Sequence, residues 1–315
     1  MKRLFLSLML LGSALPASAA EVLTTIKPIG FIAAAITRDI STPEVLLPSG
    51  ASPHDFALRP SDIRRIESAD LVVWVGPDLE QFMVKPLAGK SNTLTLLDIP
   101  GLPLHRFSEE DSHEHDHDHD AGAHEAHGHD HDDGDHDEHD HDHHAGGIDP
   151  HIWLGPNLAV PIAKAIVERL SAIDPANQAR YQANLARFEQ ELALKDKQVA
   201  SMMEPVKKQG YFVFHEAYGY WERHYGMQAK GHFTVSPERR PGAKTLVAIR
   251  KALEEQQARC VFAEPQFKPD VIESVARNTG AKVLIQDETG GDLAVGPDAY
   301  IQWMDNMAKG FAACQ

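Results

Sequence analysis

Residues 174–205 read DPANQARYQANLARFEQELALKDKQVASMMEP, and this stretch decides how the rest of the chain is organised. Asp174 is a suitable N-cap, Pro175 suits the first helical position, and Pro205 ends the pattern. We therefore predict one long helix over residues 175–204, about 45 Å long at 1.5 Å per residue, that joins two parts of the chain. Its apolar stripe consists of Tyr181, Leu185, Phe188, Leu192, Val199 and Met202.

On both sides of this helix, short apolar runs alternate with helix-like segments. Such alternation is typical of α/β units with a mostly parallel sheet. We expect two α/β lobes, residues 21–155 and 207–315, joined by connecting helices over residues 156–206. The apolar runs are Val22–Ile26, Val45–Leu47, Leu71–Val75, Leu94–Leu97, Tyr211–Phe214, Cys260–Phe262 and Lys282–Ile285. The helix-like segments include Ile29–Arg38, Leu158–Ala172 and Thr245–Gln257.

One insert, residues 108–147, carries the whole charge imbalance of the chain. The formal net charge is −16, from 46 acidic and 30 basic residues. The insert holds 16 of the acidic residues, 13 of the 19 histidines, and no Lys or Arg, which leaves 30 acidic residues against 30 basic ones elsewhere. This balance excludes a basic surface for nucleic acid. The insert has no Val, Ile, Leu, Met or aromatic residue, so we expect a disordered loop.

Residues 1–20 read MKRLFLSLMLLGSALPASAA and have the pattern of a signal peptide. Lys2 and Arg3 precede the apolar segment Leu4–Leu11, and small residues follow Pro16. The apolar segment is too short to span a membrane. With no cysteine near the cleavage region to carry a lipid anchor, we expect a soluble protein in the periplasm of a Gram-negative cell.

The two cysteines, Cys260 and Cys314, agree with an oxidising compartment, where an even number of cysteines favours pairing. We expect a disulfide between them that ties the C-terminal tail to an apolar strand. Two free thiols are the alternative.

Three histidines outside the insert stand where ligand sites form. His54 follows a strand-like run and a turn, His215 directly follows the strand YFVF, and His151 lies just beyond the insert. Asp287 follows the strand VLIQ in the same way. Three imidazoles with a carboxylate or a water make the shell that zinc prefers, and imidazole favours zinc, copper or nickel over harder cations. We therefore predict a metal site at His54, His151 and His215, with Asp287 or water as the fourth ligand.

Enzyme motifs do not fit this chain. His215-Glu216 begins like the zinc-protease motif H-E-x-x-H, but Gly219 stands where the second histidine is required. No nucleophile elbow, phosphate-binding loop or dinucleotide fingerprint stands in a suitable context. We predict a protein that is not an enzyme, with a zinc hydrolase as the alternative because three histidines and an open position also describe a catalytic site. His105, His224 and His232 are interpreted as structural or surface residues.

Four motifs carry a resemblance to a known family. They are GASPHDF at 50–56, RPSD at 59–62, DPHIWL at 149–154 and FHEAY at 214–218. Together with the acidic, histidine-rich insert, they make residues 21–315 resemble the ZnuA family, the periplasmic zinc-binding proteins of ABC importers. The resemblance implies two α/β lobes joined by a long helix, with metal held in the cleft between them.

The resemblance also implies a ligand set. His54 and His151 match ligands of the N-terminal lobe, and His215 matches a ligand of the C-terminal lobe, where manganese-binding relatives carry glutamate. Asp287 matches a carboxylate that binds metal in some relatives, whereas water completes the shell in others. Pro53 stands where some zinc-binding members have an acidic residue, which leaves the fourth ligand open.

We therefore expect a monomeric receptor that captures Zn²⁺ and delivers it to the membrane permease of an ABC importer. A periplasmic zinc buffer or chaperone without an importer is the alternative. The insert is expected to be a weaker, auxiliary zinc-collecting segment, with a solvated spacer as the alternative. Its histidines are His113, His115, His117, His119, His124, His127, His129, His131, His136, His139, His141, His143 and His144.

Overall fold

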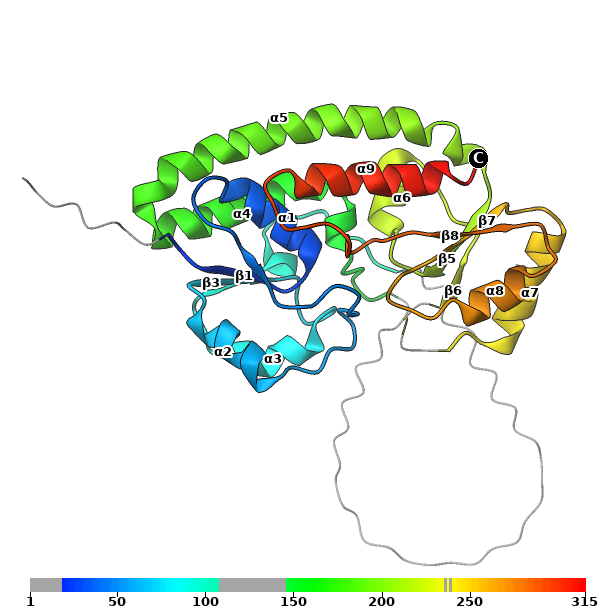
Figure 1. Cartoon of the computed structure of the whole chain (residues 1–315), viewed down its shortest axis with the longest axis horizontal. Coiled ribbons are helices and arrows are strands. Elements are labelled where there is room, and N and C mark those ends of the chain that lie inside the picture. The colour runs from blue at the N-terminus through cyan, green and yellow to red at the C-terminus, as the bar shows by residue number, and fades with distance from the viewer. Residues whose placement is uncertain (1–18, 108–145, 235–236, 238–239) are drawn as a thin grey trace, which may run out of the picture.

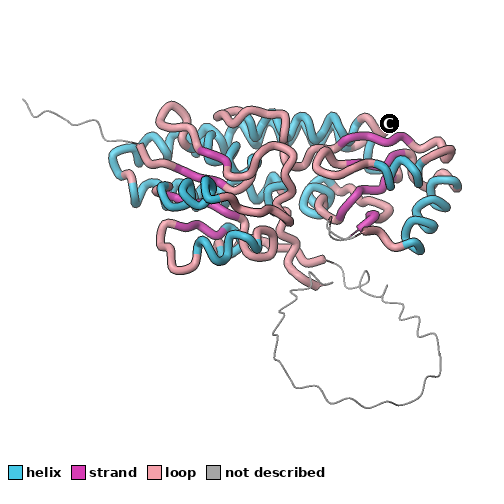
Figure 2. The backbone as a smooth tube through the Cα atoms, turned by 60° about the horizontal axis from the view of Figure 1, so that its bottom comes forward, coloured by secondary structure: helices cyan, strands magenta, loops and turns pink. Residues whose placement is uncertain are grey.

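The computed structural model describes residues 19–107, 146–234, 237 and 240–315. Within them the chain forms two four-stranded sheets in which all the paired strands are parallel. Figures 1 and 2 show the two sheets toward opposite ends of an elongated molecule, with helices running along one side of both. The predicted fold class, two α/β lobes joined by a long helix, is confirmed.

The first sheet has the strand order β2-β1-β3-β4. Its central strand β3 is the apolar run LVVW and is buried along its whole length, as expected for a parallel strand covered on both faces. The strands are β1 (Val22–Thr24), β2 (Glu44–Val45), β3 (Leu71–Trp74) and β4 (Thr93–Thr95). The helices of this lobe are α1 (Lys27–Ile36), α2 (Pro60–Ser68) and α3 (Gln81–Leu87), with a short helix η1 (Leu96–Asp98) after β4.

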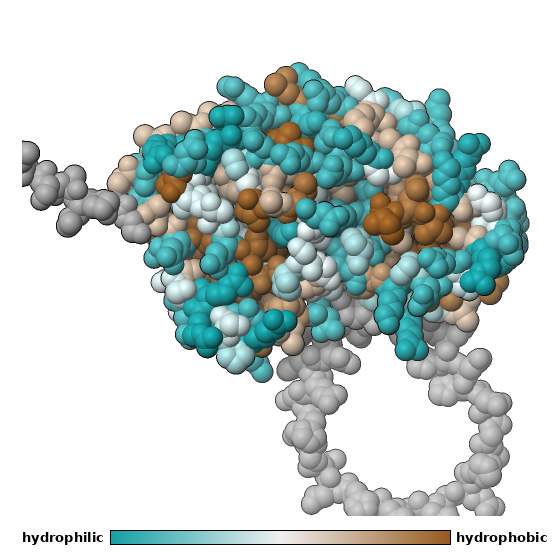
Figure 3. All heavy atoms as spheres, viewed as in Figure 1, coloured by the Kyte–Doolittle hydropathy of each residue, from teal (hydrophilic) through white to brown (hydrophobic). Residues whose placement is uncertain are grey.

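The second sheet repeats this topology, with the order β6-β5-β7-β8. Its strands are β5 (Tyr211–His215), β6 (His232–Thr234), β7 (Cys260–Ala263) and β8 (Lys282–Ile285). Its helices are α6 (Gly219–Tyr225), α7 (Ala243–Glu254) and α8 (Asp270–Ala276). Val283 and Ile285 on the edge strand β8 are exposed, and Figure 3 shows hydrophobic residues gathered over this part of the lobe.

Two helical segments link the lobes along the sequence. Helix α4 (Pro156–Ile173) starts with proline in its first turn, and α5 (Gln178–Met203) is the long helix that spans the top of Figure 1. Twenty-six residues make α5 about 39 Å long. A single turn of 3-10 helix, η4 (Pro175–Asn177), precedes it, so the α-helix begins three residues later than predicted. A second short turn, η5 (Val206–Lys208), leads into β5.

A second helix, α9 (Ala299–Ala312), also spans both lobes and runs beside α5. It packs against α1 of the first lobe, and its Phe311 ring lies 5.0 Å from the ring of Phe262 on β7. The main hydrophobic core therefore continues from the first sheet through α5 and α9 to one face of the second sheet. A smaller core on the other face is enclosed by α7 and α8. A continuous core of this kind holds the two lobes together.

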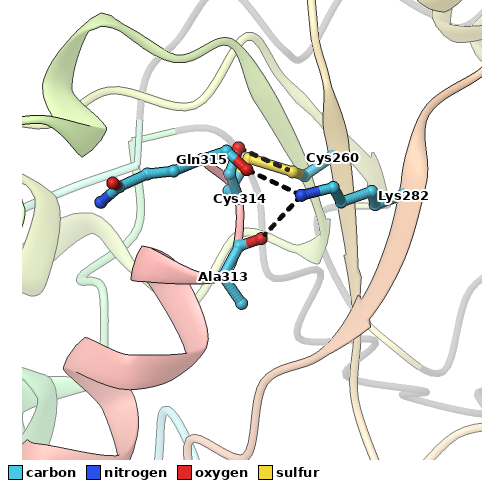
Figure 4. Close-up of a disulfide and its surroundings, with 5 residues drawn as sticks. All are labelled: Cys260, Lys282, Ala313, Cys314 and Gln315. Carbon is cyan, nitrogen blue, oxygen red and sulfur yellow. Dashed lines mark hydrogen bonds between the residues drawn. A yellow bond between two sulfur atoms is a disulfide. The ribbon is translucent and has the colours of Figure 1, made fainter.

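The disulfide between Cys260 and Cys314 confirms the predicted pairing. It joins the end of the chain, just after α9, to the first residue of β7 (Figure 4). Lys282 on β8 supports the same connection, since its Nζ donates to the carbonyl oxygens of Ala313 and Gln315. The C-terminal end of α9 is thus fixed to the second sheet.

Several elements differ from the sequence expectations. The run Leu94–Leu97 is only partly strand, because β4 ends at Thr95 and the chain then turns through η1. Strand β6 and helix α9 were not predicted. No helix in the described part of the chain has the length and hydrophobicity needed to cross a membrane. The insert and the N-terminal segment fall mostly outside the described residues.

Candidate metal centre

The three predicted histidines come together although they lie far apart in the sequence. His54 lies on the loop after β2, His215 is the last residue of β5, and His151 immediately precedes the short helix η3 (Ile152–Leu154). One ligand atom from each histidine lies within 4.8 Å of the others. The first lobe thus supplies two of the imidazoles and the second lobe supplies one.

Two of the distances between ring nitrogens match a tetrahedral zinc shell. The Nε2 atom of His151 lies 3.3 Å from Nε2 of His54 and 3.3 Å from Nε2 of His215. Two nitrogens bound to one tetrahedral zinc at 2.0–2.1 Å lie about 3.3 Å apart. The pairs His54–His151 and His151–His215 are therefore already spaced as one zinc ion requires.

Two buried carboxylates hold the rings from the opposite side. Asp149 Oδ1 lies 2.8 Å from Nδ1 of His151 and accepts the main-chain N–H of the same residue at 3.0 Å. Glu264 Oε2 lies 2.7 Å from Nδ1 of His215. Where the carboxylate is ionised it only accepts hydrogen bonds, so a neutral imidazole beside it carries its proton on Nδ1 and presents a lone pair at Nε2. Two lone pairs facing each other at 3.3 Å repel unless a cation or a proton lies between them.

Burial sets the electrostatics of this centre. His151 and His215 are only 1% and 2% exposed, whereas His54 is half-buried on its loop. Burial raises the pKa of Asp149 to about 7, against the main-chain N–H of His151 and the positive charge of Arg223, which lower it. Burial, together with the charges of Glu264 and Asp287, holds the pKa of Glu288 well above its ordinary value. Since Asp149 contacts His151, the charge of a dication bound to that ring would stabilise its ionised form.

Aromatic rings enclose the histidines. The rings of Trp153 and Phe107 lie 5.3 and 6.4 Å from the ring of His151, and Phe267 lies 6.1 Å from His215. Such rings limit how far the imidazoles can turn. The low dielectric that they create also strengthens the attraction between a bound cation and the carboxylates.

Asp287 is placed at the predicted edge of the second sheet but is not part of the three-histidine group. Its Oδ1 accepts the main-chain N–H and the hydroxyl of Thr289, at 3.2 and 3.0 Å. Its Oδ2 accepts the main-chain N–H of Gly291 at 2.6 Å. The carboxylate is thus engaged within its own turn.

Glu264 was missed by the sequence analysis. It directly follows β7, so the rule that selected His215 and Asp287 at the ends of strands also applies to it. Asp149 was part of a recognised motif but was given no role. Two other histidines contact neighbouring side chains: His224 Nε2 lies 2.8 Å from Asp196 Oδ1, and the ring of His105 packs on Tyr220. The predicted auxiliary ligands in the insert lie outside the described residues.

Solved structures show the same fold. A crystal structure of ZnuA superposes with a TM-score of 0.73, covering 94% of this chain and 99% of that one at 23% identity. The periplasmic zinc binding protein TroA from Treponema pallidum superposes with a TM-score of 0.73 at 20% identity, over 94% of this chain and 99% of that one. At these identities the likeness establishes the fold alone.

Relatives found by sequence share a larger fraction of identical residues with this chain than these structures do. The high-affinity zinc uptake system protein ZnuA of Yersinia pestis is 43% identical over 311 residues, which cover 98% of this chain and 95% of the relative. The protein of the same description from Haemophilus ducreyi is 43% identical over 315 residues, with 99% and 98% covered. The family model for ZnuA, described as zinc-uptake complex component A, periplasmic, matches residues 22–314. With a match over almost its whole length, this chain belongs to the ZnuA family of periplasmic zinc-uptake components.

Proposed function

We propose that this protein is a high-affinity zinc receptor that binds Zn²⁺ between its lobes through His54, His151 and His215. One observation carries the proposal: the Nε2 atoms of His151 and His215 face each other at 3.3 Å while a carboxylate contacts each opposite nitrogen. This arrangement suits a cation that accepts neutral nitrogen ligands. We propose that water completes the shell, while the carboxylate of Asp287 shapes its own turn.

A zinc titration of the full chain tests the proposal. Isothermal titration calorimetry with a competing chelator should reveal one tight site in the natural protein. The variant in which all three histidines are replaced by alanine should lack that site and retain only the weaker binding of the insert. If the triple variant keeps the tightest site, the proposal is wrong. A matched control is His224→Ala, which removes a histidine that contacts Asp196 outside the three-histidine group.

We further propose that the insert is an auxiliary, weaker zinc collector. Thirteen histidines interleaved with acidic residues offer many possible ligand sets, but each bound ion must order a segment without an apolar core. Its affinity should therefore lie below that of the preorganised centre. Metal binding requires neutral imidazole, so the insert should release zinc below about pH 6. A chain without residues 108–147 that binds as many zinc ions as the full chain would favour a spacer.

The partner that we propose is the permease of an ABC importer in the cytoplasmic membrane. The support is membership of a family whose relatives are described as zinc uptake system proteins. Binding of the zinc-loaded receptor to its permease, measured with and without zinc, separates this role from that of a periplasmic buffer. A buffer predicts equal and negligible binding in both states.

A further inference from the structure

The turn formed by residues 287–293 lies between the two lobes, where the chain leaves β8 on its way to α9. Asp287 shapes this turn by accepting the N–H groups of Thr289 and Gly291 and the hydroxyl of Thr289. The main-chain oxygens of Gly291 and Leu293 accept hydrogen bonds from the first lobe. The carboxylate thus determines which backbone groups the turn presents.

Lys27 at the start of α1 binds these two oxygens. Its Nζ donates to the carbonyl of Gly291 at 2.5 Å and to that of Leu293 at 2.8 Å, across 264 and 266 positions of sequence. Hydrogen bonds from an ammonium group are stronger than those between neutral partners. The half-buried position of Lys27 limits competition from water. The first lobe therefore holds the turn by a charged group.

Two aromatic residues of the first lobe fix the same turn. Trp153 Nε1 donates to the carbonyl of Glu288 at 2.9 Å. Gly290 has a φ of +65°, and a Cβ atom there would lie 2.8 Å from the ring of Phe31 and 2.9 Å from that of Trp303. Only glycine allows this close packing with this backbone conformation.

The turn also lies against both segments that carry ligands of the first lobe. Trp153 is two residues from His151. The hollow beside Lys27 is lined by Ser49, Gly50 and Pro53 of the loop that leads to His54, and on the other side by Thr289 and Gly291. A displacement of the turn would therefore change the positions of His54 and His151 relative to His215.

We propose that Lys27 and Asp287 are positioning residues of the zinc site, joined through residues 287–293 as an interlobe latch. This inference rests on the proposed function. The latch keeps the imidazoles of the two lobes at the separation that one zinc ion requires. Asp287 acts through the shape of the turn and is not the fourth ligand. The three hydrogen bonds that its carboxylate accepts hold the turn whose carbonyls Lys27 binds.

Zinc release from the full chain tests the latch. Zinc-loaded protein is mixed with excess chelator in a stopped-flow instrument, and the trace of the triple histidine-to-alanine variant is subtracted to remove binding by the insert. Lys27→Met and Asp287→Ala should each release zinc about tenfold faster, the effect expected for the loss of charge-assisted hydrogen bonds at a half-buried site. Lys27→Arg, which keeps donors, should recover most of the natural rate.

Arg38→Met is the matched control. Arg38 also donates from the first lobe to this connection, to the carbonyl of Pro297 at 3.2 Å, but at a point beyond the turn. The Arg38→Met variant should release zinc at the same rate as the natural protein. Equal acceleration in Arg38→Met and Lys27→Met would mean that any loss of lobe contacts has this effect, and would overturn the specific role of the latch.

Cobalt spectroscopy separates a positioning role from a ligand. Saturated with Co²⁺, Asp287→Ala and the natural protein should have the same visible absorption bands, because the set of ligands is unchanged. Altered bands would make Asp287 a ligand and overturn the proposal. A natural release rate in Lys27→Met, with tight zinc binding still dependent on the three histidines, overturns the latch alone. If the triple variant keeps the tight site, the proposed function fails and the latch fails with it.

Discussion

The two lobes share one sheet topology but supply the histidines of the proposed zinc site from different places. In the second lobe, the first strand of the sheet, β5, ends on His215. At the matching position of the first lobe, β1 ends on Thr24. That lobe provides His54 from the loop after β2 and His151 from the segment after the insert instead. The topology thus determines the sheet edge at which ligands gather, whereas the loops determine which side chains arrive there.

A buried glutamate follows the third strand in both lobes, and the two have different uses. Glu264, after β7, contacts Nδ1 of His215. Glu80, in the turn after β3, accepts the main-chain N–H groups of Val75 and Gly76 at 2.8 and 3.2 Å. One carboxylate therefore orients a ligand, while the other closes a turn. Glu264 must therefore stay within hydrogen-bond distance of His215, whereas Glu80 has to fit only the main chain of its own turn.

The largest effect should come from the one ligand of the second lobe. His215→Ala removes every imidazole on that side, so we expect zinc affinity to fall by at least about 1,000-fold, more than the 10–100-fold typical for a group behind the ligands. His54→Ala should cost less, because its loop is half-buried and water can enter in its place. Chelator competition on the full chain measures both. A greater loss in His54→Ala would reverse the comparison.

The disulfide gives a second test of the comparison, because it joins the end of α9 to the sheet of the second lobe and has no counterpart in the described part of the first lobe. Replacing both Cys260 and Cys314 with serine opens a loop with a sequence separation of 54 residues. The chain-entropy model predicts a loss of about 4 kcal/mol in the free energy of unfolding. Urea unfolding followed by circular dichroism measures it, with a Cys→Ala pair as a control for the polarity of serine. An unchanged midpoint would show that the buried core alone fixes α9.

Glu80 provides a pH test of the first lobe. Burial raises its pKa to about 7, above the value of about 4.5 in the unfolded chain, so the folded state favours the protonated form. Its contribution to stability is complete below about pH 4.5 and is lost as the pH rises through 7. The full difference amounts to about 3 kcal/mol.

Glu80→Gln mimics the protonated form and should remove this dependence. The difference in unfolding free energy between the natural protein and the variant, measured at pH 5 and pH 8, should move in favour of the variant at pH 8. A difference that stays constant over this range would show that Glu80 does not titrate there.

The smallest effect should come from the carboxylates behind the histidines. Glu264→Gln and Asp149→Asn keep the size of each side chain but weaken the hydrogen bond to Nδ1, so zinc affinity should fall by about 10–100-fold. The control is Glu222→Gln, a half-buried glutamate of the second lobe that accepts a hydrogen bond from the hydroxyl of Tyr211. That variant should bind zinc normally. Comparable losses in all three would point to general destabilisation.

Much of the fold was predictable, because strong apolar runs coincide with the central strands. The run over β3 and the runs over β5 and β7 are uniformly apolar, and each became a buried strand. The short strand β6 begins with a histidine and has only three residues, too few for a recognisable pattern. Helix α9 was missed although it carries Trp303 and Phe311 on a buried face. Its role across both lobes depends on tertiary packing that no local pattern reveals.

The histidines of the site were also predictable, from their places at strand ends and from motifs. The partners of their Nδ1 atoms were not assigned, since a 2.7 Å contact between Glu264 and His215 depends on how β5 and β7 pair. For Asp287, the sequence predicts the position of the residue but not the direction of its side chain. Its position at a strand end was correctly identified, but the direction of its carboxylate is set by the turn to Gly291.

A crystal structure of the full chain with one equivalent of zinc, with anomalous scattering recorded at the zinc absorption edge, tests the central claim most directly. We predict one strong peak at about 2.0–2.1 Å from Nε2 of His54, His151 and His215 together, with ligands from both lobes on the same ion. A principal peak held by histidines of one lobe only, or located away from these three rings, would contradict the account.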